Sequence, residues 1–230
     1  MELIVLWDID HTLIENAGVS KEIYSAAFTD LAGREPAGPA RTEGRTDRLI
    51  MRDMFQRNGL AEPDWTDIEG ALSGAGWSRL HDLSRRGKVL PGVREVLKEV
   101  SVRTSWVSSV LTGNIAANAR VKVAAFGLDP LLDLLVGAYG ADALQRPDLV
   151  PVARERAQRL RGAPDGVPVV LVGDTPRDVE AALSTGSEII AVASGVHSIQ
   201  ELADAGARRV LSDLTDTRQV LGILDALSVR

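Results

Sequence analysis

The segment LIVLWDIDHT, residues 3–12, joins an apolar run to two aspartates and a threonine. A short apolar run of this kind is typical of a buried strand in a parallel sheet. Aspartates at alternate positions of an extended chain point to opposite sides, so one carboxylate could act as a nucleophile while the other approaches the bound group from elsewhere. The segment therefore predicts a phosphate site that uses magnesium, and it predicts partner motifs further along the chain.

Three such motifs follow in order: LTGN at residues 111–114, RP at residues 146–147 and GDTPRD at residues 173–178. Each lies where an apolar run stops or a helix is expected to begin. Together with the first segment they resemble the haloacid dehalogenase superfamily, in its phosphoglycolate-phosphatase-like subgroup. The resemblance spans essentially the whole chain, because a long insertion like that family's helical cap separates the first two motifs. Asp10 indicates the phosphatase side, since the dehalogenases have no leaving-group oxygen to protonate and lack an aspartate there.

Composition excludes several classes of protein. The 230 residues suit a core domain with a smaller inserted module, and 45% hydrophobic with 25% charged residues is ordinary for a globular protein. Cysteine is absent, which excludes disulfides, thiolate catalysis and cysteine-ligated metals. A net charge of −6 argues against a nucleic-acid partner. No stretch approaches the roughly 20 apolar residues of a membrane span, and the first residues do not show the basic segment and cleavage site that we would expect of a signal peptide. We expect a cytoplasmic monomer or homodimer that binds a small phosphorylated metabolite and no membrane.

Residues 16–88 are predicted to form an all-helical cap. Helical spacing of apolar residues indicates helices over residues 21–31, with Ser20 as N-cap, over residues 46–57, and in further turns over residues 65–86. A loop rich in glycine and proline separates the first two helices. Glycines near both ends of the insertion could absorb the rotations of opening and closing, namely Gly18, Gly87 and Gly92.

Residues 1–15 and 89–230 are predicted to form the catalytic core. From Pro91 onward the pattern alternates between helix and strand, which is typical of an α/β fold, here a Rossmann-like parallel sheet with helices on both faces. The later strand candidates are residues 105–111, 134–136, 169–172, 189–192 and 210–211. The helix candidates between them are residues 115–126, 149–160, 177–184, 199–205 and 217–227. Because ligands bind beyond the carboxyl ends of parallel strands, the motifs are expected to converge there.

Asp8 and Asp10 are the candidate catalytic residues. Phosphate monoesters hydrolyse extremely slowly, and a carboxylate nucleophile divides the reaction through an aspartyl-phosphate. We assign Asp8 as that nucleophile. Asp10 would protonate the departing alkoxide and then activate water against the aspartyl-phosphate. The competing interpretation makes Asp10 a turn residue.

Magnesium is the expected cofactor, because it prefers octahedral coordination by oxygen and shares a phosphate oxygen. The carboxylates of Asp8 and Asp174 suit it. The resemblance implies the backbone carbonyl of Asp10 as a third ligand and Asp178 in the outer coordination shell. Asp178 also stands where a helix is expected to start, and a carboxylate is favoured there as a simple N-terminal charge. Thr12 is expected to steady the first loop rather than to touch substrate.

Phosphate is expected to meet Thr112 and Gly113, whose hydroxyl and amide stand at the start of a helix where anions are favoured. Asn114 either joins them or serves as the N-cap of that helix. The family's third motif most often supplies a lysine, and here the matching residue is Arg146, which keeps the charge but not the shape. A solvated arginine at a helix start is the alternative. Lys122 lies too early in the chain to replace it.

The cap segment GRTDR, residues 44–48, resembles the stretch through which related caps meet substrate. Arg45 is the first candidate for specificity, although a solvated cluster of charges at a helix start explains the same residues. His11 stands between two motif residues, where many relatives carry glycine, and no catalytic role is assigned to it.

The expected function is magnesium-dependent hydrolysis of a small phosphorylated metabolite. A sugar phosphomutase of the same superfamily uses the same aspartates and stays an alternative. Phosphonoacetaldehyde hydrolase needs a cap lysine, and none occurs between Lys21 and Lys88. A rival of another class is a non-catalytic regulatory domain phosphorylated on aspartate, but such domains lack the large insertion and would have no use for Asp10. An idle scaffold of the same fold is disfavoured because every motif carboxylate is present.

Overall fold

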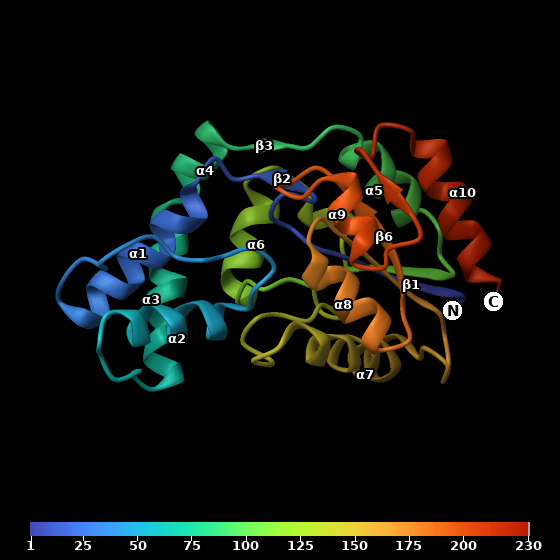
Figure 1. Ribbon diagram of the computed structural model, residues 1–230. Helices are drawn as coiled ribbons and strands as arrows, with labels where there is room; N and C mark the ends of the chain where they lie inside the picture. Colours follow the sequence, from blue (N-terminus) through green and yellow to red (C-terminus); the bar gives the residue numbers. More distant parts are fainter. Residues whose placement is uncertain (230) are drawn as a thin grey trace.

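The computed structural model describes residues 1–229 and is organised around a sheet of five parallel strands in the order β4-β1-β5-β6-β7 (Figure 1). This confirms the predicted α/β class. The strands are β1 (Leu3–Trp7), β4 (Trp106–Val110), β5 (Val169–Gly173), β6 (Glu188–Val192) and β7 (Val210–Leu211). The chain enters the sheet at its interior strand β1 and adds β4 on one side and β5 on the other, so the order of connection reverses at β1.

Strand β1 holds the two halves of the core together. Its alternate side chains enter two different hydrophobic clusters, with Leu3, Val5 and Trp7 on one face and Ile4 and Leu6 on the other. All five are inaccessible to solvent. Because burying one such side chain contributes about 2 kcal/mol, a strand that is apolar on both faces is stable only between two layers of helices.

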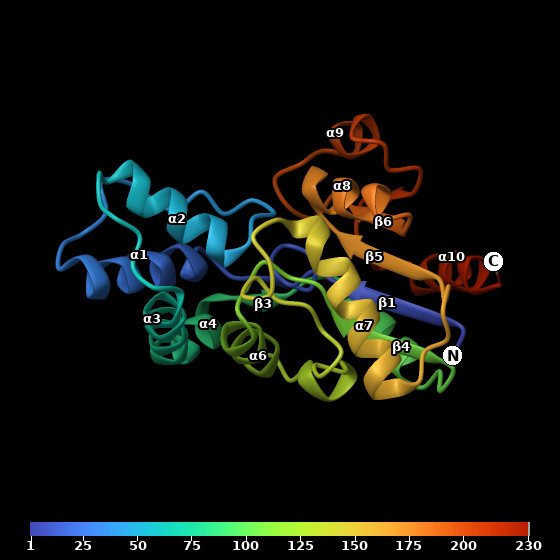
Figure 2. The same ribbon diagram turned by 90° about the horizontal axis from the view of Figure 1, so that it is seen from below.

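Helices cover both faces of the sheet. One hydrophobic cluster includes α5 (Val93–Ser101) and α10 (Thr217–Ser228), and the other includes α7 (Leu149–Arg161), α8 (Pro176–Ser184) and α9 (Ile199–Asp204). In Figure 2, α7 crosses in front of the strands while α10 lies to the side of β1. Helix α6 (Ala116–Ala124) follows β4 and lies toward the N-terminal helices. Among the described residues no helix has the length and apolar character needed to span a membrane.

The register of the sheet brings the sequence motifs to one edge. Trp7 is aligned with Val110 of β4 and with Val172 of β5. The next residues stay paired, since the Asp8 amide donates to the Val172 carbonyl at 2.9 Å and the Leu111 amide to the Trp7 carbonyl at 2.9 Å. The first, second and fourth motifs therefore leave three adjacent strands at the same level, beyond the carboxyl ends where ligands bind in such sheets.

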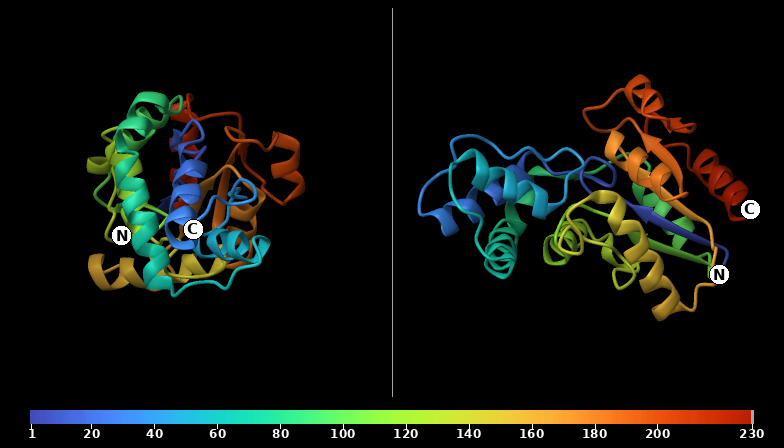
Figure 3. Two further views of the ribbon diagram at one scale, coloured as in Figure 1. Left: turned by 90° about the vertical axis from the view of Figure 1, so that its left-hand side faces the viewer. Right: turned by 60° about the horizontal axis from the view of Figure 1, so that its bottom comes forward.

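Helices α1 (Val19–Ala32), α2 (Asp47–Arg57), α3 (Trp65–Ser78) and α4 (Leu80–Arg86) gather on the side of the molecule away from both chain termini (Figures 1 and 3). The chain passes twice between these helices and the sheet. The two connecting segments pair as short antiparallel strands, β2 (Ile14–Glu15) and β3 (Lys88–Val89). This pair was not predicted. The division of the chain into a core and a cap at residues 16–88 stays a prediction.

Most predicted elements match within two residues, but two predictions were wrong. Helix α1 begins at Val19 after Gly18, which adopts a left-handed conformation, so Ser20 is not its N-cap. The segment 134–136 is not a strand. It lies in a turn after a short 3₁₀ helix (Asp129–Leu131). The residues on either side of the turn contact the sheet, since the Asp133 amide donates to the Ser108 carbonyl of β4 at 2.7 Å and Ala138 forms an isolated bridge with Leu111.

Candidate active site

A cavity of about 230 Å³ opens at the carboxyl ends of β1, β4 and β5, beneath the start of α1 and the loop before α2. Because its walls come from both the sheet and the N-terminal helices, distant segments meet in one space. The predicted site residues that line it are Asp8, Asp10, Arg45, Thr112, Gly113, Asn114, Arg146 and Asp174. The structure thus brings together every predicted residue except Thr12 and Asp178, which lie directly behind the wall in contact with Asp174 and Arg146.

Three carboxylates form the floor of this site. Asp8, Asp174 and Asp178 each offer an oxygen within 4.8 Å of the others, and all three residues are buried. One guanidinium faces them: Arg146 Nη2 lies 2.9 Å from Asp8 Oδ2 and 2.6 Å from Asp178 Oδ1. The cluster therefore carries more negative charge than its buried cation neutralises.

The pKa values reflect this excess of negative charge. Burial raises the pKa of Asp8 from 3.8 to about 6, and Asp178 adds to the effect while Arg146 opposes it. Burial, with the neighbouring Asp178 and Asp8, also raises the pKa of Asp174 well above its usual value. Oxygen ligands and uncompensated negative charge are what a hard divalent cation requires, so these residues fit magnesium. Gly195 leaves the space beside Asp174 clear, because a Cβ there would lie 1.9 Å from Asp174 Oδ2.

Arg146 is buried in a short 3₁₀ helix (Arg146–Asp148) at the start of α7. Burial opposes its charge, but Asp178 and Asp8 outweigh that effect and raise its pKa further. The side chain also donates to the carbonyls of Leu111, at 3.3 Å, and Gly44, at 3.4 Å. The solvated-arginine alternative is therefore wrong. The Nε atom of Arg146 lacks a hydrogen-bond partner among the described residues.

Asp178 performs the capping role that was weighed against a functional one, and it also contacts the site. Thr175 and Asp178 form a reciprocal capping box at the start of α8, in which each side chain accepts from the other's amide. The remaining Asp178 oxygen meets Arg146. Thr12 donates its hydroxyl to Asp174 Oδ1 at 3.1 Å, as expected of a residue that steadies the first loop.

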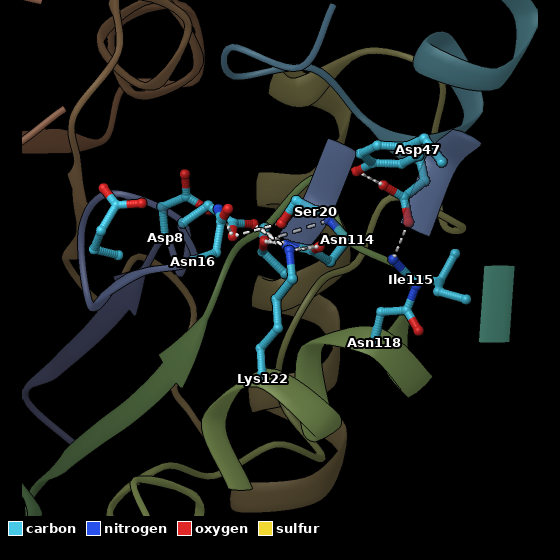
Figure 4. A network of polar contacts seen from close by, with 12 residues as sticks. Asp8, Asn16, Ser20, Asp47, Asn114, Ile115, Asn118 and Lys122 are labelled. Carbon is cyan, nitrogen blue, oxygen red and sulfur yellow. Dashed lines mark hydrogen bonds and ion pairs between the residues drawn. The ribbon is translucent and has the colours of Figure 1, made fainter. Parts of the chain in front are cut away.

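Asp10 is held on both of its oxygens by four side chains, which Figure 4 labels: Asn16, Ser20, Asn114 and Lys122. Oδ1 accepts from Asn16 at 2.8 Å and from Ser20 at 3.2 Å. Oδ2 accepts from Asn114 at 2.9 Å and from Lys122 at 2.6 Å. Burial alone would raise the pKa of Asp10, but the charge and hydrogen bond of Lys122, with Asn114, outweigh it and lower the pKa from 3.8 to about 2. In this structure Asp10 is thus a carboxylate near neutral pH.

The 112–115 loop links β4 to α6. Thr112 is fully buried, and its hydroxyl oxygen accepts a hydrogen bond from the side-chain amide of Asn114 at 2.7 Å. Ile115, not Asn114, is the N-cap of α6, so the capping alternative for Asn114 is wrong. Gly113 is needed here because a Cβ would lie 1.9 Å from the Arg45 carbonyl oxygen. The loop before α2 therefore lies directly on the 112–115 loop.

Two residues that sequence reasoning missed join these segments. Lys122 was dismissed as too early in the chain, yet its ammonium reaches Asp10 and Asn114 (Figure 4). The missed signal is its place on the apolar face of α6, seven residues after Ile115 and three after Ala119. Asp47 was interpreted only as part of a charge cluster, and it is fully buried.

Asp47 connects α2 to the 112–115 loop by two hydrogen bonds and to Tyr24 of α1 by a third. Its carboxylate accepts from the Tyr24 hydroxyl at 2.6 Å and from the Ile115 amide at 2.8 Å, and its own amide donates to the Gly113 carbonyl at 2.7 Å. Burial raises the pKa of Asp47 to about 6, although the hydrogen bonds from Tyr24 and Ile115 favour the charged form. Although its burial is unfavourable, the Asp47 carboxylate thus links the N-terminal helices to the site through specific hydrogen bonds.

The remaining predicted residues lie at the cavity's outer part. Arg45 lines it and pairs loosely with Asp53 at 3.9 Å, with its side chain 24% exposed. It is therefore neither a fully solvated charge nor a buried one. His11 has a positive φ of 60° and its ring contacts Glu15 at 3.0 Å. That left-handed backbone explains why glycine suits the same position.

Comparison with known proteins agrees with this geometry. The model of the haloacid dehalogenase-like hydrolase family matches residues 5–183. The chain is 27% identical to a phosphoglycolate phosphatase of Rhodospirillum rubrum, covering 95% of this chain and 90% of that one. It is 26% identical to the probable phosphatase IndB of Dickeya dadantii, covering 99% and 95%. A crystal structure of a hydrolase from Pseudomonas syringae superposes with a TM-score of 0.70 at 22% identity, covering 96% and 98%.

The chain belongs to the haloacid dehalogenase-like hydrolase family, as its four motifs in order indicated. Within that family it is an enzyme of the phosphatase type.

The buried Asp47 carboxylate should make stability depend on pH. Its folded-state pKa of about 6 exceeds the unfolded value of 3.8, so the folded protein keeps this proton to higher pH. Its contribution to stability is therefore present below pH 3.8 and is lost as pH rises to about 6, a change of about 3 kcal/mol. In urea unfolding between pH 4 and pH 7, Asp47→Asn should gain about that much relative to the wild type.

The comparison between variants isolates Asp47, because Asp8 and Asp174 contribute to the slope of both proteins. Asp67→Asn, at an exposed position in the first turn of α3, is the matched control and should run parallel to the wild type. Parallel curves for Asp47→Asn and the wild type would contradict the assignment of a raised pKa.

Proposed function

We propose that the protein hydrolyses a small phosphorylated metabolite in a magnesium-dependent reaction that forms an aspartyl-phosphate on Asp8. The observation that carries this proposal is the buried carboxylate cluster of Asp8, Asp174 and Asp178 at the floor of a cavity that residues 112–114 also line. Three features meet at this place: a carboxylate at the end of a strand, donors that suit a phosphate, and an excess of negative charge that suits a divalent cation.

In the first step a carboxylate oxygen of Asp8 attacks phosphorus, and the bond from phosphorus to the ester oxygen breaks. Thr112 and the Gly113 amide are the proposed donors to the phosphoryl oxygens, because they stand before α6, where amide groups and the helix dipole favour anions. Arg146 neutralises charge on Asp8 from the side and holds its second oxygen. Asp8 must be ionised to attack, and its raised pKa shows that burial alone opposes this.

The metal supplies that missing positive charge when it is bound: it would be held by the Asp8 and Asp174 carboxylates and the Asp10 carbonyl, and it would stabilise negative charge on the phosphoryl oxygens. Asp178 stays in the outer shell in this proposal, because Arg146 and Thr175 already use its two oxygens.

Asp10 is the proposed acid and base. The departing ester oxygen takes a proton from its carboxyl group, and the resulting carboxylate then takes a proton from the water that attacks the aspartyl-phosphate and releases inorganic phosphate. In this structure Asp10 starts as a carboxylate, with a pKa of about 2. A phosphate dianion beside it raises the pKa of Asp10, because a like charge disfavours the ionised form. Substrate binding thus favours the protonated acid, and phosphoryl transfer to Asp8 precedes its use as a base.

Residues 16–88 are proposed to act as a cap that selects the substrate and excludes bulk water. Several contacts join these residues to the core around the cavity: the Asp47 bonds described above, the Thr46 hydroxyl to the Leu144 carbonyl at 2.7 Å, and Arg48 to the Ala141 carbonyl at 2.8 Å. Two basic side chains of the cap, Lys21 and Arg45, line the cavity with the core residues. They favour a substrate with a second anionic group, and phosphoglycolate, the substrate in the name of several relatives, has one.

The nucleophile is tested with a panel of phosphorylated metabolites, magnesium and a phosphate-release assay. We expect the wild type to release phosphate and Asp8→Asn to lose at least about 10³-fold in kcat, because the amide cannot form the covalent intermediate. Asp67→Asn is the control and should keep full activity. Retained activity in Asp8→Asn would refute the assignment of the nucleophile. Formation of an isomer from a hexose 1-phosphate and its bisphosphate would indicate a mutase. A phosphoprotein that persists without turnover would indicate a regulatory domain.

Metal binding is tested without activity, by thermal unfolding with and without magnesium at constant ionic strength. A ligand present at 100 times its Kd stabilises the folded state by about 2.7 kcal/mol, which raises Tm by about 5 °C or more in a chain of this size. We expect Asp174→Asn to lose this shift and Asp67→Asn to keep it. An equal shift in Asp174→Asn would place the metal elsewhere.

Specificity is tested at Arg45. We expect Arg45→Met to raise KM for phosphoglycolate about tenfold with kcat changed less than about twofold, since a cation that binds the remote anion equally in ground and transition states affects binding alone. Arg41→Met is a close control, because Arg41 is more exposed and pairs with the same Asp53 carboxylate. If both variants show the same KM as the wild type, Arg45 does not contact the substrate.

A further inference from the structure

Lys122 is the only buried lysine among the described residues, with its side chain 2% exposed. It comes from the last turn of α6, and its ammonium reaches back along the helix toward the carboxyl edge of the sheet (Figure 4). Burying an ammonium group is costly unless it is paired and hydrogen-bonded. A methionine or leucine would fill the same apolar face of α6 without that cost, so packing alone does not explain a lysine here.

The partners of Lys122 are both motif residues. The ammonium donates to Asp10 Oδ2 and to Asn114 Oδ1, each at 2.6 Å. Because the Asn114 oxygen accepts from Lys122, its amide nitrogen faces the other way and donates to Asp10 at 2.9 Å and to Thr112 at 2.7 Å. One ammonium therefore orients Asp10 directly and Thr112 through Asn114.

This arrangement differs from the contacts of the other buried cation of the site. Arg146 meets Asp8 and Asp178, on the metal side, while Lys122 meets Asp10 and Asn114, on the side of the leaving group and the 112–115 loop. The two cations share no carboxylate, so neither replaces the other.

We propose that Lys122 is a positioning residue of the enzyme, which holds the acid-base group Asp10 and the phosphate-binding Thr112 in one arrangement through Asn114. This inference rests on the proposed function. Displacement of a catalytic group by about 1 Å costs on the order of 100-fold in rate, so loss of this ammonium should slow the chemical steps while leaving substrate binding nearly unchanged.

The test measures steady-state phosphate release for Lys122→Met, which keeps the length and removes the charge, and for Lys122→Gln, which keeps one donor. We expect kcat to fall about 10- to 100-fold in Lys122→Met and less in Lys122→Gln, with KM within about threefold. Arg154→Met is the matched control, because Arg154 is a partly buried cation of α7 whose side chain donates to the Val167 carbonyl and the Ser187 hydroxyl, away from the cavity. It should keep the wild-type kcat.

A double-mutant cycle distinguishes positioning from a structural role. If Lys122 acts through Asp10, Lys122→Met should lower kcat by a smaller factor in Asp10→Asn than in the wild type, because only the part that acts through Thr112 remains. Independent, multiplying losses would overturn the proposal. So would failure of both Lys122 variants to fold by circular dichroism, since the lysine would then serve stability alone.

The outcome can be separated from that of the proposed function. If the wild type releases no phosphate from any ester, the proposed function fails, and a crystal structure of Lys122→Met still tests the positioning. A rotated Asp10 carboxylate or a flipped Asn114 amide would support the inference. Unchanged side chains at both positions would overturn it.

Discussion

The repulsion among three buried carboxylates at the end of the sheet is the constraint on which the rest of the site depends. Because their oxygens lie within 4.8 Å of one another, each pair of ionised carboxylates would repel by at least about 3 kcal/mol at an effective dielectric constant of about 20. The fold imposes this arrangement, because Asp8 and Asp174 leave adjacent strands in register and Asp178 is fixed by the capping box of α8. One buried arginine relieves part of the repulsion. The remaining negative charge suits a divalent cation.

The loop before α2, which lines the cavity, and the 112–115 loop are held in place by the same contacts. Asp47 accepts from the Ile115 amide and donates its own amide to the Gly113 carbonyl, so the start of α2 and the 112–115 loop fix each other. Gly113 permits this approach, since any side chain would meet the Arg45 carbonyl. A carboxylate is used although its burial is unfavourable, because its two oxygens can accept from Tyr24 and Ile115 at once. An apolar residue would pack as well but would leave the Ile115 amide without this acceptor.

Residues that stand directly after strands were predictable, and residues whose partners are distant in sequence were not. Asp8, Thr112 and Asp174 follow apolar runs, and parallel register brings strand ends together. The error at residues 134–136 has a local cause: a brief apolar run also suits a buried turn, and periodicity cannot distinguish the two. Lys122 was missed because spacing from the motifs was used in place of helix phase. Its contact with Asp10 spans 112 positions, and no local pattern indicates a contact of that range.

The arginine at position 146, where the family most often has lysine, follows from the number of groups that this side chain must join. Its guanidinium meets two carboxylates and the carbonyls of Leu111 and Gly44, which come from the sheet and from the loop before α2. Nη2 alone meets both carboxylates and the Leu111 carbonyl, while Nη1 reaches the Gly44 carbonyl. A lysine ammonium has three donors at one point, so it could make the first three contacts but could not also reach Gly44. Arginine therefore links the loop before α2 to the carboxylate cluster as well as neutralising it. The lysine of this site stands instead at position 122, where two acceptors lie close together and a compact ammonium suffices.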